Sequence, residues 1–264
     1  MKERIGMIQV VLVGLLVIAS FAIGSLYTKV KYLEKGSSVP AAAPAAAQPQ
    51  APAAPTITLD QVKNVFTQSV IKFGDSNKKL LLIEVADPSC PYCHVAAGKN
   101  GELNKQVGDR FTLIADGGSY IAPVPEMKKL VDAGRAAFAY VYTNGHGNGE
   151  MGTKALYCAY EKGKFWEVHD LLMTSAGYAA INNSIKNDKT KSGELADFLK
   201  SVFNAGQMKQ CLDSGKYDAR IAEDSKLAAG VGVRGTPGFF INATNFAGAY
   251  SWNDMETAVA DALR

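Results

Sequence analysis

The sequence predicts an α/β fold, preceded by one transmembrane helix and a Pro/Ala linker. Two apolar runs, residues 80–86 and 136–143, have the length and composition of buried strands. A long stretch from residue 151 to about 229 has a helical pattern, and a hairpin and a helix follow it. Residues 56–264 therefore read as one domain with a helical insertion at about 150–230.

The N-terminal segment predicts a membrane span. Residues 5–28 carry no charge and are mostly apolar. As a helix they would extend about 36 Å, and the hydrocarbon core of a bilayer is about 30 Å thick. A cleaved signal peptide is the alternative, because Lys2 and Arg4 form a basic start and Ala22-Ile23-Gly24 is a weak cleavage site. We favour a retained signal-anchor, since the apolar run is long for a signal peptide.

Residues 29–55 predict a tether between the membrane and the domain. From residue 36 onward this segment is almost entirely Ala, Pro, Gln and Ser, which cannot bury a core and should be extended. Residues 1–55 hold five of the 28 basic and two of the 25 acidic side chains, so 23 of each sign remain in the domain. This balance provides no basic surface for nucleic acid, so no nucleic-acid partner is expected.

The first half of the domain is expected to begin with a helix. Thr58 and Gln61 form a capping box for a helix to about Lys72, and the strand at 80–86 follows. A helix from 90 to about 107, a short strand at 111–115 and a loop at 117–125 come next. The apolar face of the first helix would comprise Leu59, Val62, Phe66 and Val70.

The second half begins with the strand at 136–143. The insertion should break at four places: Gly177, Asn182-Asn183, Ser192 and Ser214-Gly215. Residues 238–242 and 246–250 then predict a hairpin. Ser251 and Asp254 cap a last helix that ends near Leu263.

A Cys-x-x-Cys pair follows the first strand and predicts thiol chemistry. Cys90 and Cys93 can form a small-loop disulfide, and a helix that starts at Cys90 places its sulfur near free backbone N–H groups. Cys90 is therefore the expected exposed nucleophile and Cys93 the shielded resolving thiol. Covalent haem attachment also uses the pattern completed by His94, but the buried strand has no role there. A zinc site lacks two further ligands at regular spacing, so no metal is expected.

The pair resembles the active site of the thioredoxin superfamily, because Thr236-Pro237 stands far downstream before the hairpin. Glu84 lies six residues before Cys90, about 140 residues separate Cys93 from Thr236, and a helical region at 165–172 lies between. With these features the chain is similar to a membrane-anchored bacterial member of the DsbA family of extracytoplasmic oxidoreductases. In that family a helical domain interrupts the thioredoxin fold.

The resemblance implies roles around the reactive sulfur. Pro237 would be cis and face the disulfide, and the backbone of Thr236 would help to bind an extended substrate peptide. A proline that merely ends a loop at a sheet edge is the alternative. Pro91, Tyr92 and His94 flank the sulfur and are expected at the substrate surface. His94 could also tune the thiolate by its charge; the alternative is that these side chains simply cover the site.

Glu84 is a carboxyl group within an apolar strand. Burial is costly for a carboxylate, and the resemblance implies an acid that relays a proton to or from Cys93. A glutamate on an edge strand that points to solvent is the alternative. His169 lies in the helical region beside Phe165 and Trp166, where packing or surface exposure would explain it.

Two further cysteines, Cys158 and Cys211, lie in the helical insertion. An even cysteine count in an extracytoplasmic domain predicts a structural disulfide between them. Two buried free thiols, or a regulatory disulfide, are the alternatives.

The expected function is that of an extracytoplasmic protein thiol-disulfide oxidoreductase on a single-pass anchor in the cell membrane. Residues 1–4 would be cytoplasmic, because a disulfide catalyst needs the oxidising side. The Cys90–Cys93 disulfide would oxidise reduced or unfolded substrate proteins, and a membrane redox partner would re-oxidise it, without a cofactor. An isomerase or reductase with the same site is one alternative. A non-catalytic binding or assembly module is another.

Overall fold

The computed structural model describes Ser20, Lys31 and residues 57–264. The chain separates into a unit of Met1–Ala54 and a unit of Pro55–Arg264. Apart from Ser20 and Lys31, the transmembrane segment and linker expected at 5–55 lie outside the described residues. Among the described residues, no helix is both long and apolar enough to cross a bilayer.

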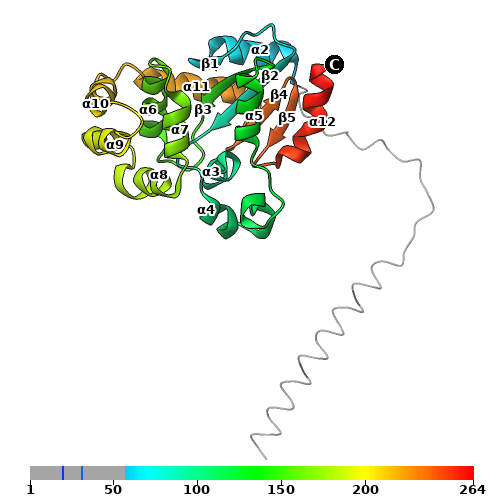
Figure 1. The fold of residues 1–264 in the computed structure, drawn as a ribbon, viewed down its shortest axis with the longest axis horizontal. Coiled ribbons are helices and arrows are strands. Elements are labelled where there is room, and N and C mark those ends of the chain that lie inside the picture. The colour runs from blue at the N-terminus through cyan, green and yellow to red at the C-terminus, as the bar shows by residue number, and fades with distance from the viewer. Residues whose placement is uncertain (1–19, 21–30, 32–56) are drawn as a thin grey trace, which may run out of the picture. The chain divides into compact units, whose positions relative to one another are not determined.

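A five-stranded mixed sheet forms the centre of the domain, in the order β1-β3-β2-β4-β5 (Figure 1). The central strand β2 pairs in parallel with β3, whereas β1 pairs antiparallel with β3, and β4 pairs antiparallel with both β2 and β5. The strands are β1 Ile71–Phe73, β2 Leu80–Ala86, β3 Ala136–Tyr142, β4 Gly238–Ile241 and β5 Thr244–Ala247.

Helices cover both faces of the sheet, because side chains alternate along β2. Leu81, Ile83 and Val85 pack with α2 (Leu59–Gln68) and α11 (Asp218–Gly230). Leu80, Leu82 and Ala86 contribute to the larger cluster on the opposite face. The helices of that cluster are α3 Pro91–Ala97, α5 Pro123–Asp132, α6 Glu150–Tyr160, α7 Phe165–Leu172 and α12 Trp252–Leu263.

The helical insertion extends from α6 to α11. It includes α8 Ser175–Ala179, a π-helical turn Ala180–Ile185, a 3-10 turn Lys189–Lys191, α9 Ser192–Phe198 and α10 Ala205–Asp213. Figure 1 shows α8, α9 and α10 together on the side of the domain away from the β4–β5 hairpin. The buried apolar side chains of α9 and α10 belong to the same cluster as Leu80 and Leu82 of β2, so the insertion shares the core of the domain.

Several local predictions are confirmed. The apolar runs form β2 and β3, the hairpin forms between β4 and β5, and Thr58 and Ser251 both cap helices through capping boxes. The second hairpin strand begins at Thr244, two residues earlier than expected.

Other boundaries were wrong because of non-local contacts or glycine. The first helix ends at Gln68, since Ile71–Phe73 pairs with β3, and Leu59 is exposed. The helix expected at 90–107 is two helices, because Gly98 has a left-handed φ of 66° and Asn100 caps α4 (Gly101–Gln106).

The segment between α4 and β3 also differs from its prediction. Residues 111–115 form no strand; 3-10 turns occupy Asp109–Phe111 and Ile114–Asp116 instead. The loop expected to reach residue 125 ends earlier, because Pro123 opens α5, which the sequence analysis missed. Gly177 lies inside α8 and does not break it.

Candidate functional site

The thiols of Cys90 and Cys93 lie at the start of α3. Cys90 is the N-cap residue in an extended conformation, Pro91 begins the helix, and Cys93 lies in its first turn. Both cysteines are free thiols in the structure. Cys93 is fully buried and Cys90 is only 4% exposed, so the expectation of an openly exposed Cys90 was wrong.

The two thiols differ strongly in acidity. A hydrogen bond from the Cys93 thiol lowers the pKa of Cys90 from 9.0 to about 6, and the backbone N–H groups of Tyr92 and Cys93 add to this effect. Burial raises the pKa of Cys93 well above 9.0, and the neighbouring Cys90 raises it further. At neutral pH the negative charge therefore sits on Cys90 and the proton stays on Cys93.

The Thr236–Pro237 turn, which begins 146 residues later in the sequence, faces Cys90. The Thr236–Pro237 peptide bond is cis, as the resemblance implied, and Pro237 precedes the interior strand β4. The Cys90 thiol donates a hydrogen bond of 3.3 Å to the carbonyl oxygen of Thr236. The interpretation of Pro237 as an ordinary edge proline was therefore wrong.

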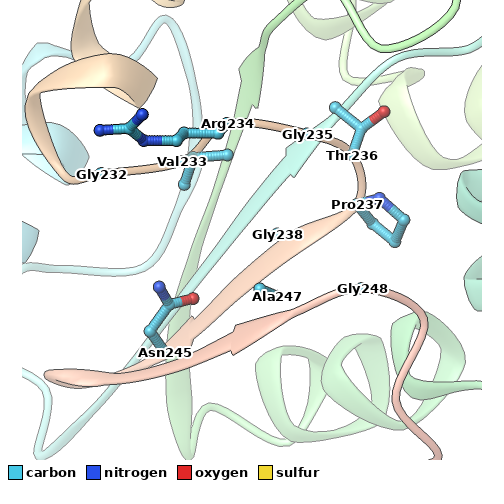
Figure 2. A pocket seen from close by; sticks show the side chains of 10 residues that line it. All are labelled: Gly232, Val233, Arg234, Gly235, Thr236, Pro237, Gly238, Asn245, Ala247 and Gly248. Atoms are coloured by element: carbon cyan, nitrogen blue, oxygen red, sulfur yellow. The ribbon is translucent and has the colours of Figure 1, made fainter. Parts of the chain in front are cut away.

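A pocket of about 420 Å³ opens beside this turn. Figure 2 shows Thr236 and Pro237 at one end of the pocket and Asn245 of the edge strand β5 at the other. Residues 232–238 supply most of its lining, together with Asn245, Ala247 and Gly248. The pocket is thus continuous with the turn that contacts Cys90.

Asp87 connects this region to a glycine-rich loop, a role that the sequence analysis missed. One oxygen of its buried carboxylate accepts hydrogen bonds from the N–H groups of Gly145 (2.8 Å) and His146 (2.9 Å). The other accepts from the N–H and hydroxyl of Ser89. A Cβ at Gly145 would lie 1.8 Å from Thr236 Oγ1, so the loop packs directly against the cis turn. Gly145-x-Gly147-x-Gly149, following a strand, is the signal that could have indicated this packing.

His94 and Tyr92 flank the thiols in different environments. His94 is fully buried, and its ring nitrogens lie 2.9 Å from the carbonyl oxygens of Met173 and Pro88. Burial lowers the pKa of His94, so the expectation that it meets substrate, or tunes Cys90 by a positive charge, was wrong. Tyr92 is 41% exposed and packs edge to face on Phe111, with ring centroids 5.7 Å apart.

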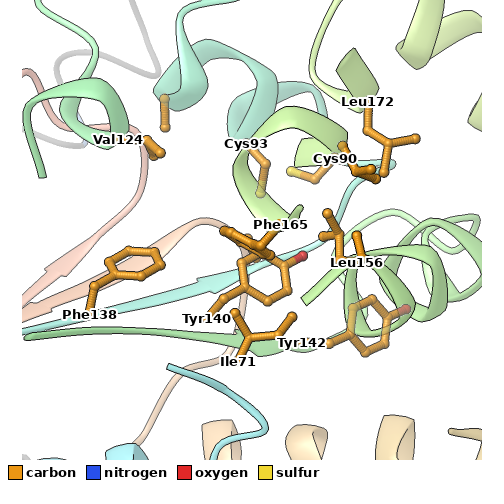
Figure 3. Close-up of a cluster of buried hydrophobic side chains, with 14 of the residues drawn as sticks. Ile71, Cys90, Cys93, Val124, Phe138, Tyr140, Tyr142, Leu156, Phe165 and Leu172 are labelled. Carbon is orange, nitrogen blue, oxygen red and sulfur yellow. The ribbon is translucent and has the colours of Figure 1, made fainter. Parts of the chain in front are cut away.

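Glu84 is a buried acid close to Cys93. It lies on the central strand and is fully buried, so the edge-strand alternative was wrong. Within the described part of the chain neither carboxyl oxygen has a hydrogen-bond partner. Burial raises its pKa to about 7, opposed by the charge of His169, and the charge of Glu84 in turn raises the pKa of Cys93. Tyr140 is the residue of β3 that pairs with Glu84. Figure 3 shows Tyr140 and Cys93 in the larger cluster of buried apolar side chains.

The remaining two cysteines form the expected disulfide. Cys158 of α6 is bonded to Cys211 of α10, which joins two helices of the insertion. Among the described residues, no group of three or more His, Cys, Asp or Glu side chains is arranged to hold a metal ion.

Comparisons with known proteins agree with this geometry. Residues 125–261, more than half of the chain, match the family described as Thioredoxin. This match begins after the Cys90–Cys93 pair.

Three solved structures show the same fold. Oxidised BdbD from Bacillus subtilis is 18% identical with a TM-score of 0.52, and the match covers 73% of this chain and 91% of that one. Wolbachia pipientis alpha-DsbA1 is 17% identical with a TM-score of 0.53, covering 73% and 89%. The thiol-disulfide exchange protein alpha-DsbA2 from the same organism is 17% identical with a TM-score of 0.51, covering 77% and 92%.

Two curated relatives are named as sodium/proton antiporters. The NhaA 3 antiporter of Salinispora tropica is 25% identical over 194 residues, and NhaA 1 of Salinispora arenicola is 24% identical over 191. Each match covers 72% of this chain and 24% of the antiporter. The chain therefore spans about a quarter of the length of these relatives.

Proposed function

The chain belongs to the thioredoxin family, and from this premise we propose that it is a protein thiol-disulfide oxidoreductase that oxidises substrate thiols. The observation that carries the proposal is the division of acidity between Cys90 and Cys93 beside the cis Thr236–Pro237 turn. A low-pKa thiol that can leave as thiolate, next to a buried thiol that keeps its proton, is the arrangement that thiol-disulfide exchange requires.

The reaction begins from the Cys90–Cys93 disulfide. A substrate thiolate attacks Cys90 Sγ, the bond between the two cysteines breaks, and Cys93 leaves with the electron pair and takes up a proton. A second substrate thiolate then attacks the substrate sulfur of the mixed disulfide and displaces Cys90 as a thiolate. Two electrons pass from the substrate dithiol to the cysteine pair, and the substrate gains a disulfide.

The acidity of Cys90 favours the oxidising direction. With a pKa of about 6, ionisation stabilises the reduced protein at pH 7 by about 1.4 kcal/mol relative to an ordinary thiol. For a two-electron couple this corresponds to about 30 mV toward a more oxidising potential. DsbA itself follows the same trend, since stabilisation of its reduced form makes it a strong oxidant.

The substrate would be a reduced or unfolded protein in extended form. We place it along the Thr236–Pro237 turn, with the adjoining pocket and the exposed ring of Tyr92 as the surfaces nearest Cys90. Pro91, which follows Cys90 at the first position of α3, has no backbone N–H group. We expect its ring to lie beside the bound substrate.

We further propose that the domain is tethered outside the cytoplasm and re-oxidised by a membrane partner. The uncharged apolar segment 5–28 and the extended linker support the tether. The Cys158–Cys211 disulfide supports an oxidising compartment. Ion transport is not proposed, because the chain spans only about a quarter of the antiporters that it matches. Carbonate extraction of membranes that contain the full chain, with protease applied from either side, tests attachment and orientation.

Trapping and equilibrium measurements test the activity. Cys93→Ser should accumulate a mixed disulfide between Cys90 and a reduced substrate protein, whereas Cys90→Ser should accumulate none. If neither variant traps substrate, the fold serves as a binding or assembly module. Equilibration with glutathione separates the directions, because a potential near −270 mV, roughly as reducing as that of thioredoxin, would indicate a reductase.

A further inference from the structure

The pocket beside the cis turn has a polar end that the exchange reaction does not use. Of the described residues that line this pocket, Arg234 alone is charged, so no carboxylate of the domain lines it. Figure 2 shows Arg234 and Asn245 toward the end of the pocket away from Pro237. The pocket therefore has hydrogen-bonding side chains at one end and the turn that contacts Cys90 at the other.

Small residues keep the pocket open. In the β4–β5 hairpin, Gly238 lies opposite Ala247 and Phe240 lies opposite Asn245, so these four residues share one face of the sheet. Phe240 packs with α2 and α11 on this face, but α11 ends at Gly230 and none of its residues lines the pocket. Glycine and alanine thus form the hairpin side of the pocket and leave room for a side chain from another molecule.

Arg234 is not committed to a partner in the domain. It is exposed, and within the described part of the chain it makes no ion pair, whereas Arg220 and Arg264 each pair with a nearby carboxylate. A cation can also stabilise the C-terminal end of a helix, but this effect is confined to the last turn. Arg234 lies four residues beyond the end of α11, so the helix end does not account for it.

The polar end of the pocket fits a carboxylate. A guanidinium presents its N–H donors in a planar fork that matches the two oxygens of a carboxylate. The amide of Asn245, which is also exposed, can donate a further hydrogen bond. A substrate lysine or arginine at this place would meet a like charge. The pocket therefore favours an aspartate or glutamate side chain.

The distance to the cis turn sets where this acid stands in the substrate. Arg234 precedes Thr236 by two residues, so their Cα atoms are at most about 7 Å apart. An extended substrate segment rises about 3.3 Å per residue. With the reacting cysteine at the turn, an acidic side chain about two to four residues away can reach the polar end of the pocket.

We propose that Arg234 is a specificity-determining residue that selects substrate proteins with an Asp or Glu about two to four residues from the reacting cysteine. The proposal rests on the redox function proposed for Cys90 and Cys93 and names its substrate class. The substrate thiolate attacks Cys90 at the cis turn while an acidic side chain of the same extended segment binds the Arg234 guanidinium. Arg234 takes no part in the bonds that form and break.

The first test measures selectivity in a double-mutant cycle. End-blocked peptides with one cysteine carry either Asp or Asn three residues before it, or three residues after it, and each reduces the oxidised full chain. The Asp-to-Asn ratio of second-order rate constants should be about three- to tenfold higher for the unmodified protein than for Arg234→Gln. The effect of Asp on the peptide's own thiol is the same for both proteins, so the cycle removes it.

Two further variants show whether the effect is local. Arg135→Gln is the matched control, because it removes another exposed arginine that lies outside the pocket, and it should keep the ratio of the unmodified protein. Arg234→Glu should reverse the preference, so that a peptide with Lys in place of Asp reacts faster than the Asp peptide. Equal ratios in the unmodified protein and Arg234→Gln, or an equal loss in Arg135→Gln, would overturn the proposal.

Filling the pocket tests the place of the contact. Ala247→Leu adds bulk beside Gly238 and should lower the Asp-to-Asn ratio toward that of Arg234→Gln. Thr244→Leu makes a similar change on the same edge strand outside this pocket and should leave the ratio unchanged. An undiminished ratio in Ala247→Leu would mean that the acid binds elsewhere.

A binding experiment without thiol chemistry separates this inference from the proposed function. An end-blocked peptide with Asp, a photoreactive group and no cysteine is cross-linked to the oxidised full chain, and the labelled residues are mapped by mass spectrometry. Labelling at residues 232–248 should be lost with Asn in place of Asp and in Arg234→Gln. Labelling that is equal in all cases would overturn the role of Arg234. If the unmodified protein labels as expected but oxidises no thiol, the redox function fails and the acid-binding pocket remains.

Discussion

Replacement of Glu84 by glutamine should change the pH dependence of folding, so that the stability of the variant relative to the unmodified protein increases as the pH rises. Burial raises the pKa of the Glu84 carboxyl from 4.5 to about 7, so the folded protein holds a proton that the unfolded chain releases. The contribution of Glu84 to the stability of the folded domain is therefore largest below pH 4.5, falls as the pH rises toward 7, and is constant above. The difference between the pKa of 4.5 in the unfolded chain and about 7 in the folded protein corresponds to about 3 kcal/mol of unfolding free energy.

Glutamine fills nearly the same space and does not titrate. Its amide has a burial cost of its own, but that cost is the same at every pH. Compared with a pH at which Glu84 is protonated in both states, ionisation of Glu84 lowers the unfolding free energy of the unmodified protein by about 0.8 kcal/mol at pH 5. At pH 8 the loss is about 3.3 kcal/mol. The stability advantage of Glu84→Gln should therefore grow by about 2.5 kcal/mol between these two pH values.

Urea unfolding at pH 5 and pH 8 measures this difference. Both proteins are kept oxidised, so that neither active-site thiol contributes to the titration. Glu102→Gln serves as the matched control, because Glu102 is an exposed glutamate of α4. Equal pH dependence of the unmodified protein and Glu84→Gln would refute the reasoning and would mean that Glu84 ionises as freely when folded as when unfolded.

Three further results are expected. The thiolate absorbance of Cys90 in the reduced protein should rise with a midpoint of about 6, and a midpoint near 9 would contradict the hydrogen-bonding argument. Peptide mass spectrometry without reductant should recover Cys158 linked to Cys211, and replacement of both by alanine should cost up to about 4 kcal/mol of unfolding free energy. Gly145→Ala should displace Thr236 and lower the rate of thiol exchange, whereas Gly230→Ala, which meets no atom within 4 Å, should leave that rate unchanged.

Short-range interactions made parts of the fold predictable. The capping box of Thr58 and Gln61 is complete within four residues, and the apolar run of β2 requires burial on both faces. The start of α3 at Cys90-Pro91 is similarly local, because proline suits the first turn of a helix. These elements depend little on the rest of the chain.

Other elements depend on partners far along the chain. The three residues of β1 form a strand because they pair with β3, some 65 residues later, and nothing in Ile71–Phe73 alone separates them from the preceding helix. The opening of α5 was read as loop because it contains Pro123 and Pro125, although both prolines lie in the first turn, where a helix tolerates them.

By itself the sequence determined the reactive chemistry: a Cys90–Cys93 pair at a helix start, a carboxyl group at Glu84, and a Thr236-Pro237 turn. Only the tertiary structure decided what surrounds these groups. It turned His94 toward the carbonyl oxygens of Pro88 and Met173, and it buried the Glu84 carboxyl group completely. The reason is physical, since residue type sets the reactions that a side chain can undergo, whereas burial and charged neighbours, which packing alone supplies, set its acidity.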